Sequence, residues 1–354
     1  MRCIWIQRIL VAFGINIACN EFHIPESMKS LLEDGIFFRR FRHYRITFRG
    51  RLKVKRQNRN CIINGKEFYY TESVKEQASV RKSFNELADK TFGLSFENWY
   101  RLGYWRDAYI PHVLLDHDIV AANISVNVID SILENRQKRY IQIGTVMTDE
   151  RYRHQGLSRF LMETVLQEWI PKCDGIYLYA NDGVIDFYPR FHFRKAEEYQ
   201  YSLTISGGTA TAGKLNMEKG EDVALLLKRY QRGNPFSRLP MLHSEGLLMF
   251  YCAQFMKDSI YGCQDLSTIV IADFEGETMT CYDIFGGNEA DMLPILHQMA
   301  GSRTKKVVFG FTPKETDGMQ SSLRQENDTT LFWYSSKECI FNGNRLMFPI
   351  LSHA

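Results

Sequence analysis

One polar segment of the sequence has the residue types and spacing to bind a phosphate. It contains Arg153, Gly156 and Ser158 in the pattern R-x-x-G-x-S, between a strand-like run that ends near Met147 and an amphipathic helical pattern. The first turn of a helix exposes unpaired backbone N–H groups and the positive end of its dipole. A glycine lets a phosphate approach the backbone, the arginine adds charge and the serine adds a hydroxyl. The pattern suits a pyrophosphate, although alone it also fits an ordinary strand–turn–helix joint.

Other catalytic and nucleotide-binding motifs are missing from the sequence. It contains neither the P-loop pattern G-x-x-x-x-G-K-[ST] nor the dinucleotide pattern G-x-G-x-x-G. It also contains no G-x-S-x-G serine-hydrolase motif and no H-E-x-x-H zinc motif. His112, His117 and His154 do not have the spacing of metal ligands. We therefore expect no metal site.

The residues that follow make the phosphate-site hypothesis more specific. The next strand-like run ends in Tyr179-Ala-Asn181, and Asp186-Phe-Tyr188 with Phe193 comes shortly afterwards. This segment resembles the GNAT superfamily of N-acetyltransferases, whose motif reads R/Q-x-x-G-x-G/A and is followed by F-Y-x-x-x-G-F. The resemblance covers about residues 66–205 in order of elements and is strongest over 140–193. It implies an α/β fold of GNAT type, with a mixed, mostly antiparallel sheet flanked by helices, and acetyl-CoA as co-substrate.

The resemblance also implies roles for individual residues. By similarity, backbone groups at the end of the motif strand bind the pantetheine arm, the turn holds the pyrophosphate, and Asn181 contacts the pantetheine. The F-Y tyrosine, often the general acid of the family, is Tyr188. The motif-strand residues are Val146, Met147 and Thr148, and the turn residues are Arg153, His154, Gln155, Gly156, Leu157 and Ser158.

The sequence departs from the family pattern at three positions. His154 replaces the glycine usual after the arginine, and Ser158 replaces glycine or alanine. His192 replaces the glycine of the F-Y-x-x-x-G-F tail. The first change makes the loop bulkier, the second is small, and the third affects a turn beside the site. We do not expect these changes to abolish function.

The implied chemistry is attack of an amine on the acetyl thioester. A backbone N–H near Val146 or Met147 can stabilise the tetrahedral oxyanion. Tyr188 can protonate the departing thiolate, because the ordinary pKa values of about 10 for a tyrosine and about 8.5 for a thiol are close. Alternatively, Tyr188 is a tyrosine packed in the core. For the proton of the amine, the open candidates are water chains, Gln142 through a bound water, and a carboxylate from a second domain.

The hydrophobic pattern predicts the elements that position these residues. Before the motif we expect a helix at 74–92, a hairpin around His117, and a strand over 140–147. A helix from 157, a strand at 176–180, a short helix at 182–190 and a strand at 201–205 follow. Beyond a small, polar linker at 206–213, the same order recurs. The elements expected there are a helix at 218–231, strands at 267–274 and 278–285, a helix at 290–300, and strands at 306–311, 331–334 and 346–351.

Length and charge define the predicted domains. The 354 residues are enough for two domains. The net charge of +3 combines a balance of +9 in residues 1–60, from thirteen Lys/Arg and four Asp/Glu, with 3 − 9 = −6 in the rest. We therefore predict a poorly ordered basic extension at 1–60, a GNAT domain at 61–205 and a second α/β domain at 206–354. The second domain has a similar order of elements, but Gly286-Gly287 lacks the arginine and spacing of a second acetyl-CoA site.

Partners and location are the least specific expectations. We expect a small-molecule or peptide amine as acceptor and no membrane partner, whereas the basic extension leaves a role on nucleic acid as an alternative. A second alternative is a module that binds acetyl-CoA as a sensor without turnover. Eight scattered cysteines indicate reduced thiols and a cytoplasmic protein. The apolar run 9–19 is either a buried segment or a poor match to a signal peptide.

Overall fold

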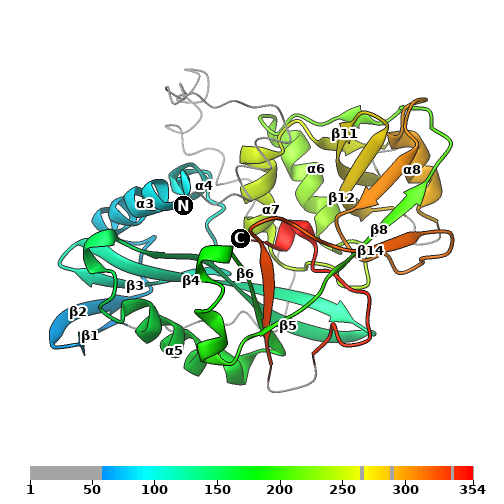
Figure 1. Ribbon diagram of the computed structural model, residues 1–354. Coiled ribbons are helices and arrows are strands. Elements are labelled where there is room, and N and C mark those ends of the chain that lie inside the picture. Colours follow the sequence, from blue (N-terminus) through cyan, green and yellow to red (C-terminus); the bar gives the residue numbers. More distant parts are fainter. Residues whose placement is uncertain (1–57, 264–266, 288–290, 336–338, 354) are drawn as a thin grey trace.

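The computed structural model describes residues 58–263, 267–287, 291–335 and 339–353. The predicted basic extension therefore lies outside the described residues, except for its last three positions. Within the described ranges the chain forms two β-sheets with helices packed against them (Figure 1). This confirms the α/β class predicted from the sequence.

The first sheet is mixed and mostly antiparallel, as expected. Its strands lie in the order β1-β2-β3-β4-β5-β6-β15-β7, and among the paired strands only β5 and β6 run parallel. The strands are β1 (Asn58–Ile63), β2 (Lys66–Thr71), β3 (Tyr109–Asp116), β4 (Ile119–Leu133), β5 (Arg136–Thr148), β6 (Gly175–Ala180), β7 (Arg194–Lys195) and β15 (Thr330–Tyr334).

Helices cover both faces of this sheet. On one face lie α3 (Ala78–Phe92) and α4 (Glu97–Arg101), and on the other lies α5 (Leu157–Trp169) (Figure 1). Successive strand residues point to opposite faces, so Val113 packs in the cluster with α3 while Leu114 packs in the cluster with α5. Each helix buries one stripe of side chains at spacings of three and four residues. The predicted short helix at 182–190 is two 3-10 turns, η3 (Asp182–Val184) and η4 (Tyr188–Phe191).

The second sheet has seven strands in the order β14-β8-β13-β12-β11-β10-β9. They are β8 (Tyr199–Thr204), β9 (Gly213–Lys214), β10 (Ile260–Gly262), β11 (Thr268–Glu275), β12 (Thr278–Gly286), β13 (Lys306–Phe309) and β14 (Gln320–Leu323). The helices of this part are α6 (Gly220–Tyr230), α7 (Glu245–Phe250), which continues as the π-helical turn η5 (Tyr251–Phe255), and α8 (Leu293–Met299).

The two sheets contain the same unit. In the first, β4 and β5 form an antiparallel hairpin, α5 follows, and β6 returns parallel to β5. In the second, β11 and β12 form the hairpin, α8 follows, and β13 returns parallel to β12. The similar order of elements predicted for the second domain is therefore present in the strand pairing as well.

The sheets exchange strands across the predicted boundary at 205/206. β8, which we expected to close the first domain, pairs with β13 and β14 of the second sheet. Conversely, β15 from the C-terminal part lies between β6 and β7 of the first sheet. A strand's own residues specify an extended, half-buried segment but not its partner, and for this reason the division by sequence differs from the division by sheet.

Two further segments differ from their predicted forms. The expected linker 206–213 is tied to the end of α8, since Thr209 and Ala210 donate backbone hydrogen bonds to the carbonyls of His297 and Ala300. The expected strand 346–351 lies in no sheet and contains the 3-10 turn η6 (Ile350–Ser352). Pro349 has no N–H for a sheet ladder, and the Phe348 N–H donates to a Glu198 carboxylate oxygen at 2.8 Å.

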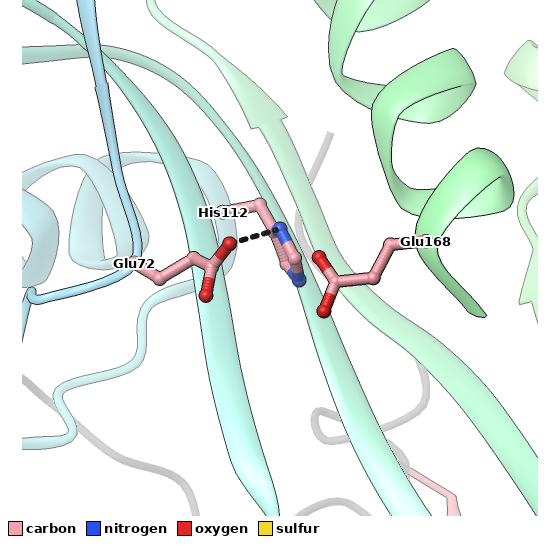
Figure 2. A group of neighbouring side chains, drawn as sticks. All are labelled: Glu72, His112 and Glu168. Atoms are coloured by element: carbon pink, nitrogen blue, oxygen red, sulfur yellow. Dashed lines mark ion pairs between the residues drawn. The ribbon is translucent and has the colours of Figure 1, made fainter. Parts of the chain in front are cut away.

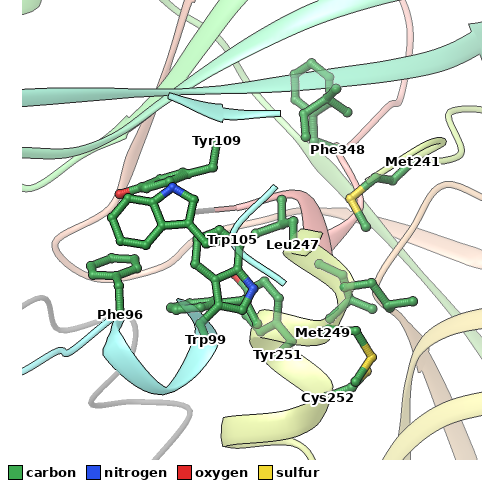
Figure 3. Packing of buried hydrophobic residues seen from close by; sticks show 14 of the residues in the cluster. Phe96, Trp99, Trp105, Tyr109, Met241, Leu247, Met249, Tyr251, Cys252 and Phe348 are labelled. Carbon is green, nitrogen blue, oxygen red and sulfur yellow. The ribbon is translucent and has the colours of Figure 1, made fainter. Parts of the chain in front are cut away.

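An aromatic core joins the face of the first sheet that α3 and α4 cover to the C-terminal part of the chain. Phe96, Trp99, Trp105 and Tyr109 pack together and against α7 (Figure 3). The indole N–H of Trp99 donates to the carbonyl of Gly246 at 2.7 Å, so its polar atom is also satisfied. This shared core places α7 on the same face of the first sheet as α3 and α4.

Candidate active site

The strand β5 contains a β-bulge at the position where its chemistry is expected. Ser125 pairs with Gly144 and Asn123 pairs with Met147, so two residues of β5 lie opposite one residue of β4. Thr145 has a φ of 49°, which is rare for a residue with a branched side chain. A bulge leaves one residue out of the ladder and turns the following side chains to the opposite face. Ile143 and Val146 consequently face the same side.

The bulge has a specific hydrogen-bonding partner. The side-chain amide of Asn123 donates to the carbonyl oxygen of Thr145 at 2.6 Å and to Ser125 Oγ at 2.9 Å. Asn123 is buried, and its Oδ1 has no hydrogen-bond partner among the described residues. An acceptor atom thus lies beside the bulge and is available to an N–H or O–H donor.

The pairing of the parallel strands β5 and β6 ends just before the bulge. Their pairing runs from Tyr140 opposite Gly175 to Ile143 opposite Leu178, and β6 then continues to Ala180 with β15 as its only partner. The backbone of β5 beyond Gly144 is therefore not hydrogen-bonded to β6. An extended ligand can form hydrogen bonds with the backbone groups along these strand edges.

The loop after β5 ends in the uncapped N-terminus of α5. Gly156 is the N-cap residue with a φ of 81°, and no side chain caps the helix. The first turn of α5 contains no acidic residue, so its N–H groups and the dipole remain available to an anion. His154 also has a left-handed backbone conformation, with a φ of 62°. The loop thus combines two residues with positive φ and a helix N-terminus without a side-chain cap.

The two arginines of this loop, Arg151 and Arg153, differ in their contacts with carboxylates. Arg151 donates to both carboxylate oxygens of Asp149, and this hydrogen bonding lowers the pKa of Asp149 below its ordinary value. Arg153 is about as exposed as Arg151, but its guanidinium lies 3.9 Å from Glu150 Oε1, beyond hydrogen-bond distance. Arg153 is therefore the more adjustable of the two arginines for contact with a phosphate.

The residues predicted for the pantetheine arm lie in the bulge and directly after it. Val146 faces α5 and is half-buried, whereas Met147 is buried in the cluster on the opposite face. The hydroxyls of Thr148 and Ser158 lie 2.7 Å apart and join the end of β5 to the first turn of α5. Leu157 is buried beneath this turn.

The remaining loop and strand-end residues have contacts within the protein. The carbonyl of Gln155 accepts a 2.8 Å hydrogen bond from Asn64 Nδ2, which connects the loop after β5 to the β1–β2 turn. The amide of Asn181, at the end of β6, donates to the carbonyl and carboxylate oxygens of Asp328. Asn181 therefore connects the separated end of β6 to the turn that leads into β15.

Tyr188 lies at the start of η4 with its ring in the cluster on the α5 face. The ring is 4% exposed and packs on Phe187, Phe193 and Phe332. Burial raises the pKa of Tyr188 well above its ordinary value, so the phenol is protonated at neutral pH.

The opposite face of the bulge is polar. The hydroxyl of Tyr109 lies 3.1 Å from Thr145 Oγ1, and the amide of Asn127 donates to Gln142 Oε1 at 2.8 Å. A small pocket adjoins this row, between the first sheet and α7, and its lining includes Trp99, Arg106, Tyr109, Asn127, Ser244 and Gly246. Residues of the C-terminal part thus form one wall of this pocket.

A buried carboxylate lies near the end of β6 on the same side. Glu198 accepts from the Tyr179 hydroxyl at 3.0 Å and pairs with Arg324 at 3.0 Å. Burial raises the pKa of Glu198 although Arg324 opposes this shift. Because its oxygens already accept from Tyr179, Arg324 and the Phe348 N–H, Glu198 holds the strand crossover together.

The fold also brings together residues that the sequence does not single out as a group. Glu72, His112 and Glu168 converge on the α5 face (Figure 2), and one potential ligand atom from each lies within 4.8 Å of the others. Of these three, the sequence draws attention only to His112, whose spacing fits no metal motif. The two carboxylates are far from it in sequence, so no local pattern reveals them.

One segment of the chain matches a known protein family. Residues 79–193 match the sequence model of the Acetyltransferase (GNAT) family. No curated protein matches the chain. Among solved structures, a conserved protein of unknown function from Enterococcus faecalis, a probable N-acyltransferase, has a TM-score of 0.49 at 11% identity, over 79% of this chain and 72% of its own.

Two further solved structures are similar to different extents. A GCN5-related N-acetyltransferase from Kribbella flavida has a TM-score of 0.48 at 14% identity, over 79% of this chain and 71% of its own. An acetyltransferase from Trypanosoma brucei has a TM-score of 0.30 at 18% identity, over 39% of this chain and 92% of its own. The family match covers β4, the bulged β5, the phosphate loop, α5 and β6. Residues 79–193 are therefore similar in sequence to the GNAT acetyltransferase family.

Proposed function

We propose that this protein transfers the acetyl group of acetyl-CoA to a primary amine by direct attack within a ternary complex. The observation that carries the proposal is the bulge at Thr145, placed between an uncapped helix N-terminus and two separated parallel strands. An acyl-CoA needs an anion site for its pyrophosphate and free backbone groups for its amide-containing arm. Both kinds of group are available within one short segment, residues 144–158.

In this proposal the cofactor arm lies along the end of β5. Backbone groups of Val146, Met147 and Thr148 hydrogen-bond to the pantetheine in place of the missing β6 ladder. The turn from Arg153 to Ser158 receives the pyrophosphate through backbone N–H groups, with the Arg153 guanidinium added. A backbone N–H near Val146 or Met147 stabilises the oxyanion of the tetrahedral intermediate.

Tyr188 is the proposed general acid for the CoA thiolate. Its raised pKa keeps the phenol protonated, which is the form that a general acid requires. The same burial makes the phenol a weaker acid than a tyrosine in water, so proton transfer to a thiolate is more uphill than it would be from an exposed tyrosine. Proton transfer from Tyr188 therefore requires the thiolate to lie close to the phenol. This contact replaces part of the contact with water that the phenol loses on burial.

The amine is proposed to approach from the face opposite α5. Asn123 Oδ1 is an acceptor beside the bulge and can receive an N–H of the substrate. The pocket between Tyr109, Asn127 and α7 lies on the same side. The acceptor proposed from these features is the amine of a small molecule or a peptide, and the general base stays open among water chains, Gln142 and a carboxylate.

The setting of the reaction is a further part of the proposal. Among the described residues, no helix is long and apolar enough to cross a membrane. We keep a cytoplasmic location as proposed from the sequence, on the basis of eight scattered cysteines with no disulfide pattern.

The test is release of free thiol from acetyl-CoA with a panel of amines, comprising a polyamine, an aminoglycoside, amino acids and a peptide. We expect at least one amine to accelerate thiol release and to yield an N-acetyl product by mass spectrometry. Tyr188→Phe should lower kcat by about 10²-fold or more without changing acetyl-CoA affinity. Tyr140→Phe is the matched control, because the Tyr140 hydroxyl is buried without a partner among the described residues on the opposite face.

Two results would decide against parts of the proposal. If Tyr188→Phe and wild type release thiol at equal rates, Tyr188 is not the acid. If acetyl-CoA binds but no amine stimulates its cleavage, the chain is an acetyl-CoA-binding module.

A further inference from the structure

A second cluster of ionisable groups lies at the other end of α5 from the phosphate loop. Glu72 follows β2, His112 lies in β3 and Glu168 lies in the last turn of α5 (Figure 2). Gly156 and Glu168 are separated by about 18 Å along the helix axis, since each helical residue rises 1.5 Å. The cluster is therefore separate from the proposed acetyl-CoA site.

The hydrogen bonds of Tyr70 determine which His112 nitrogen carries the proton. The Tyr70 hydroxyl donates its single proton to Glu72 Oε1 at 2.8 Å. The same hydroxyl oxygen lies 2.7 Å from His112 Nδ1, so it accepts the Nδ1–H of the imidazole. The neutral ring then has its lone pair on Nε2, the nitrogen that faces the carboxylate of Glu168 in Figure 2.

The lone pair on His112 Nε2 has no protein donor. His112 is 0% exposed, and Nε2 forms no hydrogen bond with any described residue. A buried nitrogen acceptor without a donor is costly unless a cation or proton approaches it.

Glu168 presents an oxygen to the same space. Its Oε1 accepts from Lys172 Nζ at 3.0 Å, whereas its buried Oε2 has no hydrogen-bond partner among the described residues. Together with Glu72, two carboxylates and one imidazole lone pair converge from three separate elements. One proton can bridge only two acceptor atoms, whereas one metal ion can bind all three.

We infer that Glu72, His112 and Glu168 bind a divalent transition-metal ion. One imidazole and two carboxylates suit Zn²⁺, Mn²⁺ or Co²⁺ better than Mg²⁺ or Ca²⁺, which prefer oxygen ligands alone. The metal adds positive charge between the two carboxylates, of which Glu168 also pairs with Lys172. Tyr70 then acts as the outer partner that orients both Glu72 and His112, as is usual for metal-bound histidine.

The inferred metal has a structural consequence. It connects the last turn of α5 to β2 and β3, while α5 begins at the proposed pyrophosphate loop. Binding to the folded state alone raises the free energy of unfolding in proportion to the logarithm of metal concentration. The inference does not depend on the proposed acetyltransfer, because the two sites share no residue.

The experiment uses the full chain, stripped with EDTA and returned to chelator-free buffer. ZnCl2, MnCl2 and CoCl2 are each titrated by calorimetry, and thermal unfolding is followed with and without the metal. We expect one ion per chain, a higher Tm with metal, and a Co²⁺ spectrum typical of mixed nitrogen and oxygen ligands. Glu168→Gln should weaken binding by more than about tenfold, and Tyr70→Phe by about 10- to 100-fold.

Glu163→Gln is the matched control, because Glu163 is an exposed residue of the same helix. It should bind metal as wild type does, and acetyl-CoA affinity should be equal in Glu163→Gln and Glu168→Gln. The inference is overturned if none of the three metals binds at one ion per chain. It is equally overturned if Glu168→Gln, shown to be folded by circular dichroism, binds metal with wild-type affinity.

Discussion

The amide of Asn123 and the carbonyl of Thr145 form a 2.6 Å hydrogen bond across the bulge of β5. This bond satisfies a backbone group that the interrupted ladder leaves out, and so it stabilises the left-handed conformation of Thr145. The proposed oxyanion site and the proposed path of the acceptor both adjoin this bond.

We expect Asn123→Ala to impair the site through the bulge. Removing a buried hydrogen bond costs about 1–3 kcal/mol in the free energy of unfolding, because the partner carbonyl is left unsatisfied. Asn127→Ala removes a comparable buried bond, to Gln142, away from the bulge. Urea unfolding should show similar losses for both variants, whereas acetyl-CoA affinity should fall only in Asn123→Ala. Equal affinities in the two variants would contradict a role for the bulge.

Gly156→Ala should weaken both folding and cofactor binding. The φ of 81° costs alanine about 1–2 kcal/mol, and an added Cβ would lie 3.3 Å from Asn64 Nδ2. Gly65→Ala is a matched control, since Gly65 has the same φ of 81° but nothing within 4 Å of an added Cβ. Both variants should lose stability in urea, and only Gly156→Ala should bind acetyl-CoA more weakly. A wild-type affinity in Gly156→Ala would exclude close approach of the pyrophosphate at this residue.

His192→Gly should make the protein more stable. His192 is exposed and has a φ of 66°, so glycine removes strain without removing packing. The added freedom of glycine in the unfolded chain offsets part of this gain, which leaves about 0.5–1 kcal/mol. Arg190→Gly, an exposed change in the same turn without a positive φ, should lower stability instead. If the urea midpoints of both variants shift in the same direction, this explanation is wrong.

Asp283 predicts a specific dependence of stability on pH. Burial raises the pKa of Asp283 to about 7, although Asn234 Nδ2 donates to Oδ1 at 2.6 Å. The folded state then binds a proton that the unfolded state releases near pH 4, so this contribution to stability is lost as pH rises from about 4 to 7. Its full size is up to about 4 kcal/mol.

Comparison of Asp283→Asn with wild type isolates this contribution. The variant should gain stability relative to wild type between pH 4 and pH 8, as measured by urea unfolding at each pH. Asp118→Asn, a change in an exposed hairpin turn, should show a much smaller pH-dependent difference. A constant difference between Asp283→Asn and wild type across this range would show that Asp283 ionises normally.

Some features of the site are local in sequence and were predicted for that reason. Arg153, Gly156 and Ser158 lie within one turn and the start of one helix, and strand and helix patterns flank them directly. The two histidines at glycine positions of the family, His154 and His192, both adopt positive φ angles. Positive φ angles thus occur at both positions where histidine replaces the glycine of the family pattern.

The sequence alone determined the α/β class and most of the order of elements, because hydrophobic period and turn chemistry act over a few residues. Only the tertiary structure decided that β8 and β15 exchange sheets, since strand pairing depends on partners far along the chain. It also decided that Glu72, His112 and Glu168 meet, because packing α5 onto β3 brings together side chains whose separation in sequence matches no motif. Both arrangements depend on long-range contacts in the core, which no local sequence pattern predicts.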